Sequence, residues 1–157
     1  SQSVRFVFPF AEEYGVIVIA PDSRRVGWGA EVPGFDDDSK YIAEAFREVV
    51  EFLNIDRSRV ALGGVSDGAT YAFAMGLSYG DTFNHLMIFS TGMMGPLRKQ
   101  GKPKIFVAHG LNDTQMPIDR TARRLVPPLQ AEGYDVTYRE YDGGHGAPRE
   151  LVGEGFH

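Results

Sequence analysis

The sequence predicts a three-layer α/β fold with a mostly parallel sheet, and two observations support that prediction. Short apolar runs of strand length alternate along the chain with segments whose apolar residues recur at helical spacing. Some of these runs are apolar throughout, as is typical of parallel strands that have helices on both faces. We expect strands at 16–20, 59–63, 85–90, 105–109 and 136–141.

The segment from 36 to 53 is predicted to be a helix. Acidic residues at 36–38 favour the positive end of a helix. They lack the spacing of an EF-hand loop, so we expect no calcium site there. Apolar residues follow at helical spacing, and we expect them to face the core: Tyr41, Ile42, Ala45, Phe46, Val49, Val50 and Leu53.

Three further helices are expected. One runs from Asp67 to Tyr79 through good helix formers. Another begins near Met116 and is predicted to be interrupted at 127–128, where two prolines stand. The last begins at Pro148.

The chain is centred on residues 60–72, where an apolar strand meets a glycine cluster and then an alanine-rich helix. Residues 64–68 read Gly-Val-Ser-Asp-Gly, the G-x-S-x-G pattern of a nucleophile elbow. We expect side chains at Gly64 and Gly68 to collide with neighbouring backbone in so tight a turn. The bend would aim the backbone N–H of Asp67 at the space above Ser66, where negative charge develops during acyl transfer.

A serine in this position needs a base and a carboxylate, which follow it along the chain in this kind of fold. Asp113 lies in the loop after the strand at 105–109, and His145 lies in a glycine loop after the strand at 136–141. His109 is the alternative base, and Asp119 and Asp142 are the alternative acids. The remaining histidines have simpler interpretations: His85 as structural and His157 as terminal and frayed.

Three motifs together resemble the α/β-hydrolase superfamily. They are the elbow, the H-G-x-x-D-x-x-x-P stretch at 109–117 and the G-G-H-G segment at 143–146. Within the superfamily they look most like the phospholipase/carboxylesterase and polyhydroxybutyrate-depolymerase-like serine esterases. The resemblance covers nearly the whole chain, as a single α/β-hydrolase domain over 1–157. It implies that Ser66 is the nucleophile, Asp113 the orienting acid and His145 the general base, with a small-molecule ester as substrate and no cofactor.

One part of the family pattern is missing. In the family, a helix precedes the strand expected here at 16–20, and residues 12–15 would form the end of that helix. Before this helix the family has an apolar strand ending in a His-Gly loop, and that loop supplies the second oxyanion donor beside the Asp67 amide. In the family sheet, the absent strand lies between those expected here at 16–20 and 59–63. We therefore expect an N-terminally truncated or minimal hydrolase whose strands re-pair, or a homo-oligomer in which a second copy fills the gap.

Four residues are candidates for a substrate pocket. Met93 and Met94 follow the strand at 85–90, at the edge where ligands bind in parallel sheets. With Met116 and Trp28 they could line a pocket for short acyl groups. The methionines could equally pack against the helix layer, and Trp28 could cover the sheet edge.

Composition excludes several classes of function. The net charge of −5 disfavours nucleic acid, and no apolar stretch is long enough to span a membrane. No His and carboxylate cluster has metal-ligand spacing. The chain has no cysteine and no charged-then-apolar signal segment, which is compatible with the cytoplasm. The remaining alternative to an esterase is a weakly active or silent hydrolase remnant that acts as a binding module.

Overall fold

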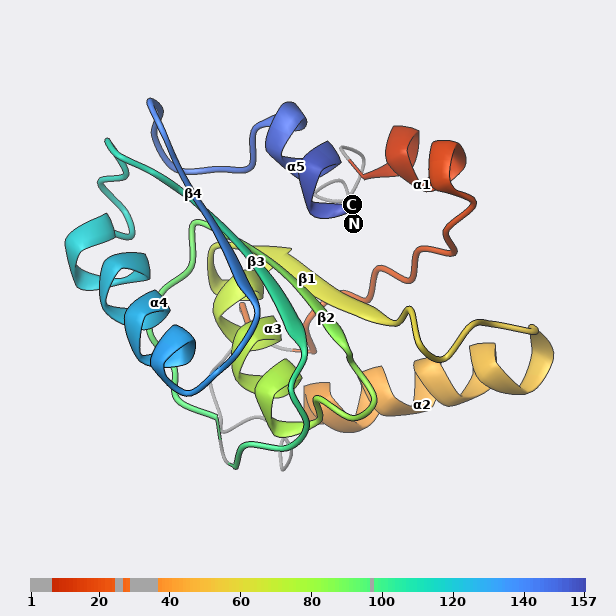
Figure 1. Ribbon diagram of the computed structural model, residues 1–157. Helices are drawn as coiled ribbons and strands as arrows, with labels where there is room; N and C mark the ends of the chain where they lie inside the picture. Colours follow the sequence, from red (N-terminus) through yellow and green to blue (C-terminus); the bar gives the residue numbers. More distant parts are fainter. Residues whose placement is uncertain (1–6, 25–26, 29–36, 97) are drawn as a thin grey trace.

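The computed structural model describes residues 7–24, 27–28, 37–96 and 98–157 (Figure 1). A four-stranded sheet lies at the centre, with all strands parallel in the order β1-β2-β3-β4. The strands are β1 (Ala61–Val65), β2 (His85–Phe89), β3 (Lys104–Gly110) and β4 (Val136–Tyr141). The four strands expected from residue 59 onward are therefore confirmed.

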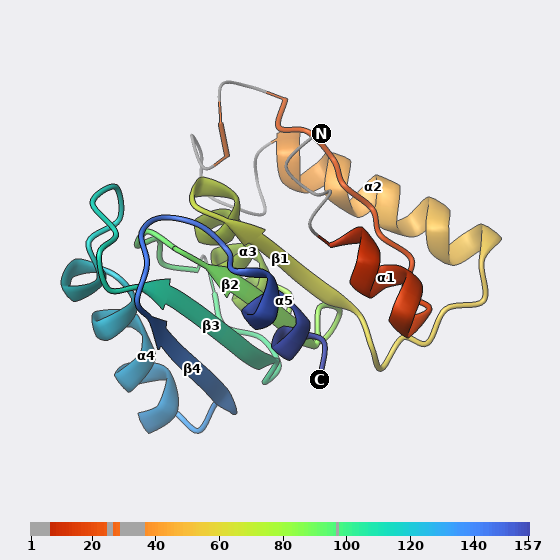
Figure 2. The ribbon, with the colours of Figure 1, turned by 90° about the horizontal axis from the view of Figure 1, so that it is seen from above.

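Helices cover both faces of this sheet, which confirms the three-layer fold (Figures 1 and 2). One face carries α2 (Asp37–Phe52), α3 (Asp67–Ser78) and α4 (Ala122–Ala131), which follows the short 3-10 helix η2 (Ile118–Arg120). The other face carries α5 (Arg149–Gly155), and α1 (Phe8–Tyr14) lies beside α5. The rings of Phe10 and Phe156 stack with their centroids 5.8 Å apart and connect these two helices.

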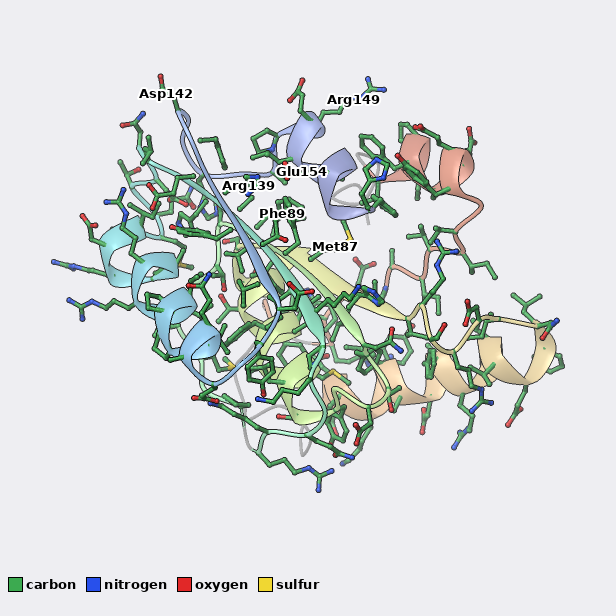
Figure 3. All side chains as sticks on the ribbon, in the orientation of Figure 1. Met87, Phe89, Arg139, Asp142, Arg149 and Glu154 are labelled. Carbon is green, nitrogen blue, oxygen red and sulfur yellow. The ribbon has the colours of Figure 1, made fainter. Side chains whose placement is uncertain are left out.

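The core follows the alternation of side chains along the strands. Leu86 and Ile88 of β2 face the cluster under α3 and α4. Met87 and Phe89 point the other way, toward α5 (Figure 3). Helix α3 lies so close to β2 that a Cβ at Gly76 would overlap the side chain of Leu86. Both faces of β2 are thus covered, as a parallel strand requires.

The predicted strand at 16–20 is wrong. This segment has no regular secondary structure, and Val16, Ile17 and Ile19 are 39%, 52% and 43% exposed. Within the described residues, β1 pairs with β2 and with no other strand. An apolar run becomes a strand only where a neighbour offers hydrogen-bond partners, so without one this segment stays outside the sheet.

Two helix predictions need correction. Helix α2 forms as expected, but of its seven predicted core residues only Ile42 is buried, while Tyr41 and Leu53 are exposed. The sheet ends at β1 in the described residues and offers α2 little surface to cover. Helix α4 continues through Pro127 and Pro128 without interruption. Its buried residues Leu125, Val126 and Leu129 pack into the core and offset the lost backbone hydrogen bonds.

No helix in the described ranges is long and apolar enough to cross a membrane.

Candidate active site

Ser66 lies at the sharp turn between β1 and α3. Its backbone has φ 61° and ψ −124°, a conformation that residues other than glycine rarely adopt. Both sides of the turn hold it there: the Ser66 N–H donates to the Phe89 carbonyl at 3.0 Å, and the Ser66 carbonyl accepts from the Thr70 N–H at 3.0 Å. The half-buried hydroxyl therefore stands at the carboxyl end of β1 and the N-terminus of α3.

The two elbow glycines differ in their packing. A Cβ at Gly64 would lie 2.5 Å from the carbonyl carbon of Gly68, so the predicted collision is confirmed there. For Gly68 the prediction is wrong. The nearest atom to a Cβ at that position is Cδ1 of Trp28, at an ordinary contact distance of 3.7 Å. Position 68 is already in the first turn of α3 and points toward the tryptophan ring.

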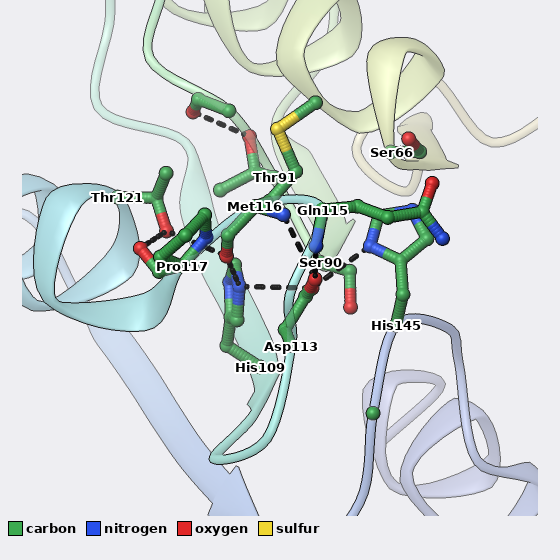
Figure 4. Close-up of polar contacts among 12 residues, drawn as sticks. Ser66, Ser90, Thr91, His109, Asp113, Gln115, Met116, Pro117, Thr121 and His145 are labelled. Carbon is green, nitrogen blue, oxygen red and sulfur yellow. Dashed lines mark hydrogen bonds and ion pairs between the residues drawn. The ribbon is translucent and has the colours of Figure 1, made fainter.

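The structure brings Asp113 and His145 together although they are far apart in the sequence. The Nδ1 atom of His145 lies 2.8 Å from Oδ2 of Asp113 (Figure 4). Oδ1 of Asp113 accepts from the backbone N–H groups of Gln115 and Met116 at 2.9 and 2.8 Å. The carboxyl group therefore has a donor on each oxygen.

These contacts set the charge of the carboxyl group. Burial by itself raises the pKa of Asp113, but the hydrogen bonds from the Met116 amide and from His145 outweigh it and hold the pKa below its usual range. An ionised carboxylate can only accept hydrogen bonds, so Nδ1 of His145 carries the proton and Nε2 is free to take another.

Ser66 and His145 approach each other from opposite sides of the site. Helix α3 brings Ser66, and the loop after β4 brings His145 (Figure 4). No hydrogen bond joins the two side chains among the residues that Figure 4 draws. In sites without substrate, catalytic hydrogen bonds are often long and tighten only when substrate binds.

The alternative acids and bases have other partners. His109 is fully buried on the far side of Asp113, with Nε2 at 2.7 Å from the Met116 carbonyl oxygen and at 3.2 Å from Oδ2 of Asp113. Its Nδ1 has no partner in the described structure. Asp119 is 77% exposed and pairs with Arg123 at 2.8 Å.

Asp142 and the other two histidines lie away from Ser66. Asp142 is exposed at the tip beyond β4 and accepts from the amide of Asn112 at 3.0 Å (Figure 3). His85 contacts the neighbouring Asn84 side chain at 2.8 Å. His157 is not frayed, because the hydroxyl of Tyr14 lies 2.8 Å from its Nε2.

Asp67, the expected oxyanion donor, is the first residue of α3, where backbone N–H groups have no partner within the helix. Its carboxylate accepts from the backbone N–H groups of Trp28 and Gly68, each at 2.9 Å. The Trp28 ring packs on Tyr71 with centroids 5.2 Å apart, against the core under α3.

The three methionines differ in exposure. Met93 is 55% exposed, and Met94 and Met116 are half-buried. The sulfur of Met116 lies close to Gly92, where a Cβ would meet it at 3.3 Å. The same Cβ would lie 3.0 Å from the hydroxyl oxygen of Thr70, which bonds to the Ser66 carbonyl, so Met116 lies close to the first turn of α3.

The hydroxyl groups that connect the loops of the site were not predicted from the sequence. Thr70 Oγ1 donates to the Ser66 carbonyl at 2.9 Å and accepts from the Gly92 N–H at 2.7 Å. Ser90 Oγ contacts both backbone polar groups of Gly146. The signal available for Ser90 was its position at the carboxyl end of a predicted strand, at the edge where loops of such sheets converge.

Over the ranges that the structure describes, no three His, Asp or Glu side chains cluster closely enough to hold a metal ion.

No family model matches this chain, and no curated protein matches it. Several solved structures are similar to it. Esterase PE8 is 20% identical with a TM-score of 0.63 over 74% of this chain and 54% of its own, so the chain spans about half of that protein. A Bacillus cereus carboxylesterase is 18% identical with a TM-score of 0.73 over 96% of this chain and 78% of its own. Arabidopsis thaliana SOBER1 is 19% identical with a TM-score of 0.60 over 86% of this chain and 70% of its own.

The likeness to these structures is a likeness of fold. With its parallel sheet, its covering helices and the sharp turn after β1, this chain has the α/β-hydrolase fold. The predicted fold class is therefore confirmed.

Proposed function

We propose that this chain is a serine hydrolase that cleaves carboxylic esters through an acyl-enzyme, with Ser66, Asp113 and His145 as its triad. The observation that carries the proposal is the meeting of two features at the carboxyl edge of the sheet. One is the strained turn that presents Ser66, and the other is the 2.8 Å contact between His145 and an ionised Asp113. The names of the similar structures, a carboxylesterase and an esterase among them, agree with this function.

Each group has a distinct task in the proposed reaction. Ser66 Oγ attacks the ester carbonyl while Nε2 of His145 takes the hydroxyl proton, and the same proton then passes to the departing alcohol. Water attacks the resulting acyl-serine with His145 again as base, which releases the acid. Asp113 keeps the imidazole in the tautomer with Nδ1 protonated, and the Asp67 N–H donates to the oxyanion.

The proposed substrates are small esters with short acyl chains. Met116 lies beside Gly92 and Thr70, close to the elbow. With Met94, Met93 and Trp28 it would offer an apolar wall of limited size. Nitrophenyl acetate and butyrate should therefore turn over faster than long-chain esters, and a rate maximum at long fatty chains would contradict this pocket.

A second candidate function is a silent or weakly active binding module. Two features favour it. Figure 4 shows no hydrogen bond between the side chains of Ser66 and His145, and the Asp67 amide is the single donor proposed here for the oxyanion. Loss of one oxyanion donor costs about 10²–10³ in turnover.

Covalent labelling separates the two functions. A fluorophosphonate should modify Ser66 in the folded protein, and heat-unfolded protein and Ser66→Ala should remain unlabelled. Ser66→Ala and His145→Ala should each reduce ester turnover to near background, and the double variant should lose little more because the triad acts as a unit. Folded protein that neither labels nor hydrolyses esters would favour the binding module.

A further inference from the structure

Ser90 is buried among the residues of the candidate site, directly after β2 (Figure 4). None of its surface is exposed, and its φ of 46° is rare for serine. Strained backbone of this kind persists only where the surrounding structure holds it, and it is frequent at functional sites. Of the non-glycine residues that the structure describes, Ser66 also has a positive φ.

The Ser90 hydroxyl bridges both backbone polar groups of Gly146, the residue that follows His145. It donates to the Gly146 carbonyl at 3.0 Å and accepts from the Gly146 N–H at 3.0 Å. Gly146 has a φ of 153°, which side chains rarely permit.

This bridge connects the His145 loop to the rigid part of the molecule. The Ser90 N–H donates to the Ala108 carbonyl of β3 at 3.0 Å, which fixes Ser90 to the sheet. Tyr141, the last residue of β4, places its hydroxyl 3.0 Å from the carbonyl oxygens of Gly144 and Gly146. Hydrogen bonds therefore hold the loop on both sides of His145. On the Gly146 side, the Gly146 N–H donates to the Ser90 hydroxyl.

We propose that Ser90 is a positioning residue that sets the place of the His145 imidazole relative to Ser66. The inference rests on the proposed function and deepens it. The hydrogen bonds of the Ser90 hydroxyl are to Gly146, so Ser90 acts on the base through that residue. A misplacement of reacting groups by about 1 Å can cost about 10²-fold in rate, so a hydroxyl that locates the base affects kcat rather than KM.

The test uses Ser90→Ala and Ser90→Gly, with Ser78→Ala as the matched control. Ser78 is also fully buried, and its hydroxyl donates to the Ala74 carbonyl at 2.8 Å within α3. The control thus removes a buried serine hydroxyl away from the His145 loop. Ser90→Gly removes the hydroxyl and also relieves the strain of the positive φ, so it folds even if Ser90→Ala does not.

Three measurements are compared across these variants: nitrophenyl acetate kinetics, hydrogen exchange of the Gly146 amide, and the low-field proton resonance of His145 Nδ1. Both Ser90 variants should lower kcat by about 10- to 100-fold with KM nearly unchanged. They should speed Gly146 exchange by about tenfold and weaken the His145 resonance. Ser78→Ala should keep all three at wild-type values.

The outcomes separate this inference from the proposed function. If both Ser90 variants match Ser78→Ala, or if only Gly146 exchange changes while kcat and the His145 resonance do not, Ser90 does not position the base. If the wild-type protein neither hydrolyses esters nor labels with fluorophosphonate, the proposed function fails. In that case the Gly146 exchange and the His145 resonance alone decide whether Ser90 holds the histidine.

Discussion

Ser66 and Gly64 depend on each other at the scale of single residues. Ser66 keeps its φ of 61° because the chain reverses within a few residues, and the reversal brings the backbone at 68 against the Cα of Gly64. A side chain at position 64 would push these two segments apart. The geometry of the nucleophile thus depends on a residue that takes no part in the chemistry.

Alanine at the two elbow glycines should therefore have different effects on stability. Gly64→Ala places a Cβ 2.5 Å from backbone carbon, so it should destabilise the protein by about 1–3 kcal/mol and abolish labelling of Ser66. Gly68→Ala meets only Trp28 at 3.7 Å and favours the helix, so its stability should stay within about 1 kcal/mol of wild type. Urea unfolding of both variants gives the comparison, and equal losses would contradict the packing described here.

The lowered pKa of Asp113 makes a pH-dependent contribution to stability. Because the folded pKa lies below the unfolded value, the folded state favours the ionised form. The stabilisation is complete above the unfolded pKa, about 3.9, and is lost as the pH falls through the folded pKa.

Asp113→Asn should reveal this contribution, because asparagine keeps an acceptor for the amides of Gln115 and Met116 but loses the charge. We expect the variant to be about 1–3 kcal/mol less stable than wild type at pH 7 and the gap to narrow below pH 4. Urea unfolding at several pH values measures it. Asp119→Asn, at an exposed position, is the control and should show a much smaller gap at every pH. A gap for Asp113→Asn that stays constant with pH would mean that the charge contributes nothing.

At the scale of elements, the contact between α3 and β2 determines how closely the nucleophile helix lies on the sheet. Gly76 lies in the last turn of α3, where alanine would normally be favoured by up to about 1 kcal/mol. The side chain of Leu86 occupies the space that a Cβ would need. Close packing therefore outweighs helix propensity at this position.

Gly76→Ala should destabilise the protein by about 1–3 kcal/mol through this overlap. In a Leu86→Ala background the same change should cost much less, because the overlapping side chain is gone. A double-mutant cycle by urea unfolding measures the coupling, which we expect to exceed about 1 kcal/mol. Additive losses would show that the helix shifts to avoid Leu86.

At the scale of the whole molecule, the outer edge of β1 has no strand beside it in the described residues. The Val60 carbonyl and the Ser66 N–H both form hydrogen bonds with backbone groups of β2. Backbone groups alternate in direction along a strand, so those of Ala61 and Gly63 point to the outer edge. Unpaired edges of this kind promote association with another chain.

We therefore expect the chain to self-associate through β1, and we expect Ala61→Pro to weaken that association. Proline removes an outward N–H at the first position of an edge strand, where it is tolerated and leaves the pairing with β2 intact. Light scattering over a range of concentrations, with ester turnover measured on the same samples, is the test. A wild-type protein that stays monomeric throughout would contradict the expectation.

The sequence by itself determined the features that depend on local pattern. Apolar runs and glycine turns predicted five strands, of which four form the parallel sheet, and placed Ser66, Asp113 and His145 each just beyond the end of one of these four. Parallel strands bring their carboxyl ends to one edge, so residues 32 positions apart such as Asp113 and His145 lie within 2.8 Å. Both the fold class and the candidate site residues could be read from these motifs.

Tertiary structure alone decided the features that depend on a neighbour. The apolar run at 16–20 could have become a strand, but it stays outside the sheet because no strand in the described residues offers it partners. The burial of α2 depends on how much sheet lies beneath it. Ser90 and Thr70 bind backbone groups of distant residues, and since every residue carries such groups, no pattern in the sequence could have shown which ones these hydroxyls would meet.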